Sequence, residues 1–160
     1  MVTRIIESNP QLVIILVLSL LLIGIRIIQI WINYSKSNYG AISGISLTQV
    51  LFNKGNYGEF RIFAMLENLS ERGRLLTNLY VPKVNGPMTE IDLVMIDQTG
   101  IYVIESKNYG GWIFGDPNSK YWTQSLKGGN KNRFLNPIRQ NRSHIKALQT
   151  VLPQIDGVHF

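Results

Sequence analysis

The residues best suited to chemistry in this chain are two carboxylates, Asp92 and Glu105, and an ammonium group, Lys107. They belong to two stretches rich in Ile, Val and Leu, 90–96 and 101–107, which flank a turn-prone segment. This pattern predicts two antiparallel strands joined by a short loop. Carboxylate oxygens from neighbouring strands are the ligands that a hard divalent cation takes. The spacing therefore indicates a metal site at one end of a hairpin.

The register of the hairpin decides whether these side chains meet. If Asp97–Gly100 forms the loop and Ile96 faces Ile101, then Asp92 faces Glu105 on the same side of the sheet. Two facing carboxylates repel each other, and burying them unpaired costs on the order of several kcal/mol, which a shared cation would offset. A slip of one residue would send them to opposite faces. A solvated surface stripe is the ordinary alternative for a Glu-x-Lys pattern.

The same residues resemble the D-(D/E)-x-K signature of the restriction-endonuclease-like phosphodiesterases: Asp92, a spacer of 12 residues, then Glu105-Ser106-Lys107. The surrounding sequence is closer to one branch of these enzymes, the nuclease-related domain called NERD. The resemblance covers roughly Tyr57 to the C-terminus. The similar blocks occur in the expected order and are Gly58-Glu59, Glu90-Ile91-Asp92, Gly100 to Gly111, and Asn136 to Gln140.

The resemblance implies an α/β fold with a helix-strand-strand-strand-helix-strand core, its last strand truncated at Phe160. It also implies metal-dependent hydrolysis of phosphodiester bonds in nucleic acid, with DNA favoured over RNA. Asp92 and Glu105 would hold Mg²⁺ or Mn²⁺ together with the Ser106 carbonyl and water. Lys107 would orient the attacking water or stabilise the transition state.

Two predicted helices carry the supporting residues. Residues 58–69 have helical periodicity, with Glu59 at the start of the apolar face, and Asn136-Pro137 marks the start of a second helix. Carried over from the family blocks, Glu59 would act near the metal and Gln140 near the nucleophile. An acidic residue in a first turn is also favourable for the helix dipole alone, which leaves Glu59 open. His144 is taken as an ordinary residue.

The C-terminal third is strongly basic, because no acidic residue lies between Asp116 and Asp156. The flat side chains of Tyr121, Trp122 and Phe134 lie among the basic ones. Such a segment can attract a polyanion and stack bases. A solvated basic face, or a patch resting on anionic lipid, is the alternative. The expected nucleic-acid contacts are Lys120, Lys127, Lys131, Arg133, Arg139 and Arg142.

The apolar run Leu12–Ile32 contains Arg26 as its only charge and is long enough to cross a hydrocarbon core of about 30 Å as one helix. We expect this helix to be continuous and to pack against nothing in the globular part. A cleaved signal peptide is the alternative, but the run exceeds an ordinary apolar region and no small-x-small site follows it directly. Flanking charges do not fix the orientation, and a nuclease fold would place the domain in the cytoplasm.

These observations predict three parts: an N-terminal region over 1–37 with a single membrane span at about 12–32, a juxtamembrane linker over 38–56, and a nuclease-like domain over 57–160. The predicted function is a membrane-anchored, metal-dependent nuclease-like domain. The alternative from another class is an inactive, membrane-tethered module that binds nucleic acid or protein. The absence of cysteine excludes disulfides and thiolate metal sites within the chain.

Overall fold

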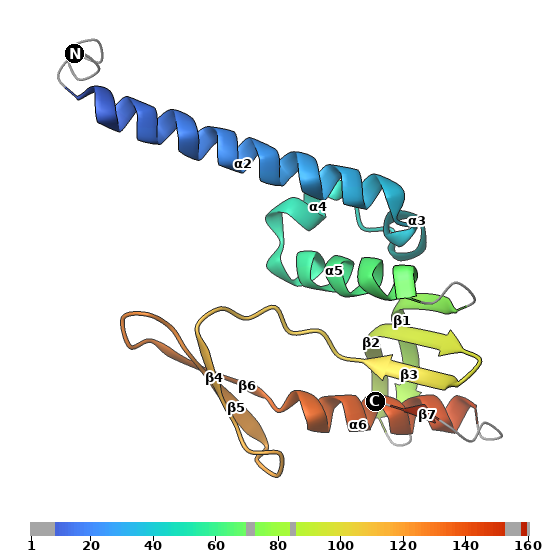
Figure 1. Cartoon of the computed structure of the whole chain (residues 1–160). Helices are drawn as coiled ribbons and strands as arrows, with labels where there is room; N and C mark the ends of the chain where they lie inside the picture. The colour runs from blue at the N-terminus through green and yellow to red at the C-terminus, as the bar shows by residue number, and fades with distance from the viewer. Residues whose placement is uncertain (1–8, 70–72, 84–85, 153–157, 160) are drawn as a thin grey trace.

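The computed structural model describes residues 9–69, 73–83, 86–152 and 158–159. A long N-terminal helix leads to a helical layer, a four-stranded sheet, a C-terminal helix, and a second sheet that projects from the body (Figure 1). The helices are α2 (Pro10–Lys36), α3 (Tyr39–Ser43), α4 (Leu47–Phe52), α5 (Lys54–Leu69) and α6 (Pro137–Val151). The strands are β1 (Arg74–Lys83), β2 (Gly86–Asp97), β3 (Gly100–Ile104), β4 (Trp112–Phe114), β5 (Tyr121–Ser125), β6 (Lys131–Leu135) and β7 (Val158–His159).

The main sheet has the order β1-β2-β3-β7. Strands β1, β2 and β3 are antiparallel neighbours, and β7 lies parallel to β3. Ile96 pairs with Ile101 and Leu93 with Ile104, which confirms the register predicted for the hairpin. The element order α5-β1-β2-β3-α6-β7 confirms the predicted α/β core, and β7 forms the beginning of its expected last strand.

Alternation along β2 and β3 gives the sheet two apolar faces, each covered by helices. On one face, Val94 and Val103 pack in one cluster with Ile145 and Leu148 of α6. On the other face, Leu93 joins the cluster formed by α3, α4 and α5. Each fully buried side chain of this size contributes about 1.5–3 kcal/mol to stability. The two faces therefore hold α5 and α6 in fixed places on either side of the hairpin.

The segment 38–56, expected as a linker, instead folds as the short helices α3 and α4. Tyr39 and Val50 are fully buried, and the Tyr39 ring packs against Phe60 and Phe63 of α5 with centroid distances of 5.6 and 5.4 Å. The Ser and Asn content that suggested a linker supplies helix caps, such as the capping box that begins α4 at Ser46. This segment is thus packed onto the sheet domain.

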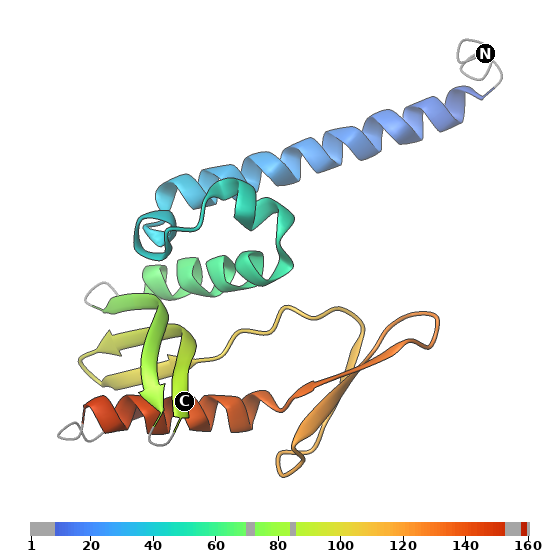
Figure 2. The same cartoon turned by 180° about the vertical axis from the view of Figure 1, so that it is seen from behind.

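Helix α2 is one continuous helix of 27 residues that is long and apolar enough to cross a membrane by length and composition. The expectation that this helix packs against nothing in the globular part is wrong for its C-terminal end, because Ile30 and Tyr34 pack against the cluster formed by α3, α4 and α5. The Tyr34 hydroxyl also donates a hydrogen bond to the carbonyl oxygen of Ile45 at 2.6 Å. The final turns of α2 therefore belong to the body, whereas its apolar N-terminal part projects away from it (Figure 2).

The second sheet, with the order β4-β5-β6, forms an arm between β3 and α6. It contains the edge piece expected at Trp112 and a ribbon formed by β5 and β6. The arm is fastened to α6 by Asn136, which is fully buried. The Asn136 side chain caps α6 by accepting from the Ile138 and Arg139 amides, and its Nδ2 donates to carbonyl oxygens of Asp116, Pro117 and Ser119.

Candidate functional site

Asp92 lies on β2 at a break in the pairing with β1. Thr77 pairs with Leu93 and Leu79 with Ile91, whereas the position between them is skipped. Asn78, opposite Asp92, has a φ of 53°, in the left-handed region that Asn tolerates better than most residues. Residues two apart on a regular strand point to the same face. Here Leu93 belongs to the cluster on the α5 side and Ile91 to the cluster on the α6 side, so the side chains change face at the break.

The Asp92 carboxylate fixes the chain just after β3. Its Oδ2 accepts a hydrogen bond from the Ser106 amide at 2.8 Å. Regular pairing stops one step earlier, at Leu93 and Ile104, so Asp92 and Glu105 occupy the next positions at the open end of the hairpin. Burial first, and then the charge of Asp92, raise the pKa of the Glu105 carboxyl, and the second effect reflects the closeness of the two carboxylates. The structure thus brings the two predicted carboxylates together.

The Glu105 carboxylate is almost fully buried, with 3% of the side chain exposed, and contacts two cationic or basic groups. Lys107 Nζ donates to Oε1. On the other side, His144 Nδ1 lies 3.3 Å from Oε2, but neither atom makes a hydrogen bond. Burial lowers the pKa of His144, so this imidazole is biased toward its neutral form. Oε2 is therefore a buried acceptor that its own protein partners leave unsatisfied.

Burial is the main reason that the pKa of Glu105 is raised from 4.5 to about 7, and Asp92 adds to the effect, whereas the hydrogen bond from Lys107 opposes it. The pKa of Glu59 is also raised, first by burial and then by the charges of Asp92 and Glu90. Carboxyl groups of raised pKa that crowd one another are typical of functional sites.

An open pocket of about 420 Å³ lies beside this cluster, although Glu105 itself is not among the described residues that line it. Glu59, Asp92, Ser106 and Lys107 line it, so the structure places Glu59 of α5 beside the hairpin residues, as expected. Gln124 of the arm also lines the pocket and donates a hydrogen bond from Nε2 to the Gly110 carbonyl at 2.9 Å.

Gly58 explains how the segment that carries Lys107 comes so close to α5. A Cβ at this position would lie 2.7 Å from Cβ of Asn108 and 3.4 Å from Oγ of Ser106, so a side chain would displace this backbone. The Asn108 amide also donates to the carbonyl oxygen of Lys54 at 2.7 Å. The Gly58-Glu59 pair therefore allows the close approach and supplies the neighbouring carboxyl.

On α6 the structure points to residues that the sequence analysis did not select. Asn141 is buried and donates from Nδ2 to the Val103 carbonyl at 3.0 Å, while His144 faces Glu105. Both continue the buried stripe of Ile145 and Leu148 by four-residue spacing, and two polar residues in an apolar stripe were the available signal. Gln140 is half-buried and, among the described residues, belongs neither to the pocket lining nor to the contacts of Glu105.

The six expected nucleic-acid contacts fall into separate places, and none lines the pocket over the described parts of the chain. Arg139 and Arg142 border a shallow hollow between α6 and the β4–β5 turn, together with Lys146. Lys120 and Arg133 flank the Tyr121 ring, at 5.3 and 5.1 Å from its centroid. The remaining two, Lys127 and Lys131, border the turn between β5 and β6.

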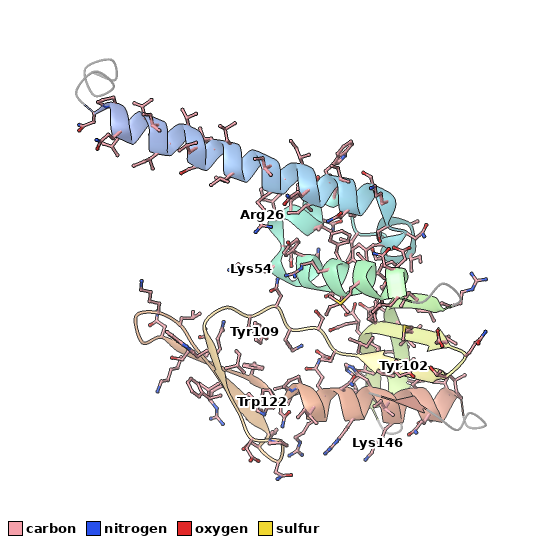
Figure 3. The ribbon with its side chains drawn as sticks, in the orientation of Figure 1. Arg26, Lys54, Tyr102, Tyr109, Trp122 and Lys146 are labelled. Atoms are coloured by element: carbon pink, nitrogen blue, oxygen red, sulfur yellow. The ribbon has the colours of Figure 1, made fainter. Side chains whose placement is uncertain are left out.

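The aromatic residues of the arm also divide between its two faces. Trp122 pairs with Phe134 on the face turned toward the body, where Tyr109 packs on Phe134 at 4.6 Å. Figure 3 shows Tyr109 on the segment that leads from β3 to the arm and Trp122 on the arm itself. The opposite face carries Trp112 and Phe114, which are 62% and 61% exposed.

The donor set fits a divalent cation. Asp92 and Glu105 contribute carboxylate oxygens, and Oε2 of Glu105 is buried without a hydrogen bond. Over the residues that the structure describes, no group of three or more His, Asp or Glu side chains is arranged to hold a metal ion. A cation here would consequently depend on two carboxylates with carbonyl and water oxygens, as Mg²⁺ commonly does.

A helix-flanked sheet with a carboxylate pair and a lysine at the end of its central hairpin is the arrangement of the restriction-endonuclease-like class. The sequence profile of the nuclease-related domain family matches residues 54–160, and the chain belongs to this family. An uncharacterized protein of Bacillus anthracis is 39% identical over 102 residues, which cover 63% of this chain and 48% of that protein. The chain thus spans about half the length of this curated relative, and no solved structure matches it.

Proposed function

We propose that the chain is a metal-dependent nuclease that hydrolyses phosphodiester bonds at the pocket beside Asp92, Glu105 and Lys107. The observation that carries the proposal is the buried Glu105 carboxylate, whose raised pKa and unsatisfied oxygen mark a place for a cation. Membership of the nuclease-related family supports the reaction class. The metal would be Mg²⁺ or Mn²⁺, held by Asp92 and Glu105 with the Ser106 carbonyl and water.

Such an ion lowers the pKa of a bound water and neutralises charge that develops on the phosphate. The chain's own residues perform the positioning. Asp92 holds the Ser106 amide and so fixes the backbone at the pocket wall. Lys107, partly exposed and paired with Glu105, can turn its ammonium group toward a phosphate oxygen or a water in the pocket. Glu59, at the rim, can accept a hydrogen bond from that water.

The outward face of the arm is the proposed contact surface for unpaired nucleic acid. Paired residues share a face, so Trp112, Phe114, Tyr121, Lys131 and Arg133 lie on one side of the β4-β5-β6 sheet. Stacked bases contribute about 1–3 kcal/mol each to affinity, and cations bind phosphates. Gln124, which lines the pocket, lies on the opposite face of the same sheet, so a strand held on the outward face would have to cross the edge of the arm to enter the pocket.

Membrane anchoring through α2 is the second part of the proposal. The nuclease-related domain and the short helices α3 and α4 would then lie in the cytoplasm. The supporting observations are the length and apolar exposure of α2. In carbonate extraction of membranes from expressing cells, the full chain should remain in the pellet. Release into the supernatant would contradict the anchor and would leave the nuclease proposal untouched.

The nuclease proposal is tested with the full chain in non-ionic detergent. Single- and double-stranded DNA and RNA are incubated with excess EDTA, Mg²⁺ or Mn²⁺. Cleavage that requires a divalent cation and disappears in Asp92→Asn supports the proposal. Binding of nucleic acid without cleavage under all metal conditions would instead favour an inactive, membrane-tethered binding module.

A further inference from the structure

A groove lies where α2 meets the body, between α2, α4 and the start of α5. It has a volume of about 740 Å³ and opens to the surface. Apolar walls come from Ile30 and Leu51, and Phe52 at the end of α4 is 86% exposed. Burying the exposed apolar surface of Phe52 against an apolar ligand would be favourable, because transfer of apolar surface out of water lowers the free energy. Figure 1 shows that α4 and the start of α5 lie below the C-terminal half of α2.

The charged residues that line this groove have one sign. Arg26, Lys54 and Arg61 contribute cations, and no carboxylate is part of the lining over the described residues. Figure 3 shows that Arg26 and Lys54 lie at the same end of the body. The guanidinium group of Arg61 also lies over the Tyr57 ring, 5.8 Å from its centroid, which helps to orient it. The groove is thus complementary to an anion that carries an apolar attachment.

The packing of α2 sets the depth of this groove relative to a bilayer. Ile30 and Tyr34 are packed onto the body, so the lipid-exposed part of α2 ends before them. A hydrocarbon core of about 30 Å needs about 20 helical residues. If the roughly 20 residues before Ile30 span the hydrocarbon core, they include nearly the whole apolar run. Arg26 then lies about one helical turn from the headgroup layer, and its side chain can extend toward the interface.

We propose that this groove binds the headgroup of an anionic phospholipid, with Arg26 and Arg61 on the phosphate and Phe52 against the acyl chains. The proposal rests on α2 being a membrane anchor and is independent of nuclease activity. A nucleic acid is the less suitable occupant, because apolar walls and an exposed Phe52 beside a membrane helix favour a ligand with a lipid tail. Lys54 also lines the pocket of the candidate nuclease site, so a bound lipid would lie directly beside that pocket.

The test compares the full chain in non-ionic detergent with added dihexanoyl phosphatidylglycerol or dihexanoyl phosphatidylcholine. Binding is measured by native mass spectrometry and by the shift in thermal midpoint. The double variant Arg26→Gln/Arg61→Gln removes two cations from the groove, and Arg74→Gln/Lys146→Gln removes two from elsewhere on the body. We expect the anionic lipid alone to bind the parent, with at least a tenfold loss in the groove variant and no loss in the matched control.

Three results would overturn the proposal. Equal binding of both lipids would exclude recognition of the anionic headgroup. Equal effects from glycerol phosphate or inorganic phosphate would identify a free-phosphate site that does not need a membrane. Competition by a short oligonucleotide that is lost in the groove variant would assign the groove to nucleic acid. Circular dichroism without lipid shows whether each variant is folded, and the carbonate extraction described above reports separately on the anchor.

Discussion

Replacing Glu105 by Gln should make the metal-free protein more stable at alkaline pH, although it removes a residue of the proposed metal site. The folded-state pKa of about 7 lies above the ordinary value of 4.5. A raised carboxyl pKa means that the folded state binds the proton more tightly than the unfolded state. Stability linked to Glu105 is therefore greatest at low pH and declines as the pH rises from about 4.5 through about 7.

The magnitude follows from the same values. One pKa unit corresponds to about 1.4 kcal/mol, so the ionised carboxylate costs the fold about 3 kcal/mol once the pH is well above 7. This figure is an upper value, because solvent at the open end of the hairpin screens part of the cost even though only 3% of the Glu105 side chain is exposed. A glutamine keeps the size, remains neutral at every pH, and can still accept from Lys107 or donate to the neutral His144.

The assay is thermal unfolding of the EDTA-treated full chain in non-ionic detergent, followed by tryptophan fluorescence at about pH 5 and about pH 8. The stability of Glu105→Gln minus that of the parent should increase by roughly 2 to 3 kcal/mol between the two pH values, or roughly 5 to 10 °C in midpoint. Taking this difference cancels the contributions of titratable groups that do not interact with Glu105. Asp116→Asn, at the exposed turn of the arm, is the matched control and should show no such change.

Adding Mn²⁺ at about pH 8 should reverse the order, because the ion relieves the charge in the parent and finds one carboxylate fewer in the variant. A difference between parent and variant that stays constant across pH within about 0.5 kcal/mol would refute the reasoning. It would mean that Glu105 is solvated or already paired, and that its unsatisfied oxygen is no sign of a cation.

The other predictions concern metal affinity, backbone approach, the arm's attachment and its outward face. Asp92→Asn should weaken Mn²⁺ binding in calorimetry by at least tenfold, and unchanged binding would remove Asp92 from the site. Gly58→Ala should reduce both stability and cleavage, because the clash with the neighbouring segment outweighs a gain of about 1 kcal/mol in helix propensity; a more stable and active variant would contradict this. Asn136→Ala should lose about 2–4 kcal/mol in chemical denaturation, since a cap and three buried carbonyl contacts disappear together. Trp112→Ala/Phe114→Ala should weaken binding of a single-stranded oligonucleotide at least tenfold without changing Mn²⁺ affinity, and equal binding would exclude this face.

Local patterns made much of the fold predictable from the sequence. The hairpin register followed from apolar alternation around one turn, and the start of α6 followed from an Asn-Pro pair at its N-terminus. The site was predictable where its residues lie close along the same hairpin, as Asp92 and Glu105 do. The structure adds the unpaired position at Asn78, which no local signal announces.

Other features depend on contacts between distant parts of the chain. His144 contacts Glu105 only because α6 packs against β3 and brings the imidazole to the end of that strand. The α3–α4 segment looked like a linker because its helices are short and polar, and only burial of Tyr39 and Val50 against α5 stabilises them. Likewise, the sequence could not tell which aromatic residues of the arm face outward, since pairing between three strands decides it.

The most direct test of the proposed nuclease is single-turnover cleavage by Lys107→Met, measured beside Mn²⁺ binding by the same preparation at about pH 8.5. The alkaline pH keeps Glu105 ionised after its lysine partner is gone. Lys36→Met, at the C-terminal end of α2, is the matched control and should leave both properties unchanged. We predict that Lys107→Met loses at least about 100-fold in cleavage rate while its Mn²⁺ affinity stays within about threefold of the parent. Cleavage at the parental rate by Lys107→Met, with the same metal requirement, would contradict the assignment of catalysis to this site.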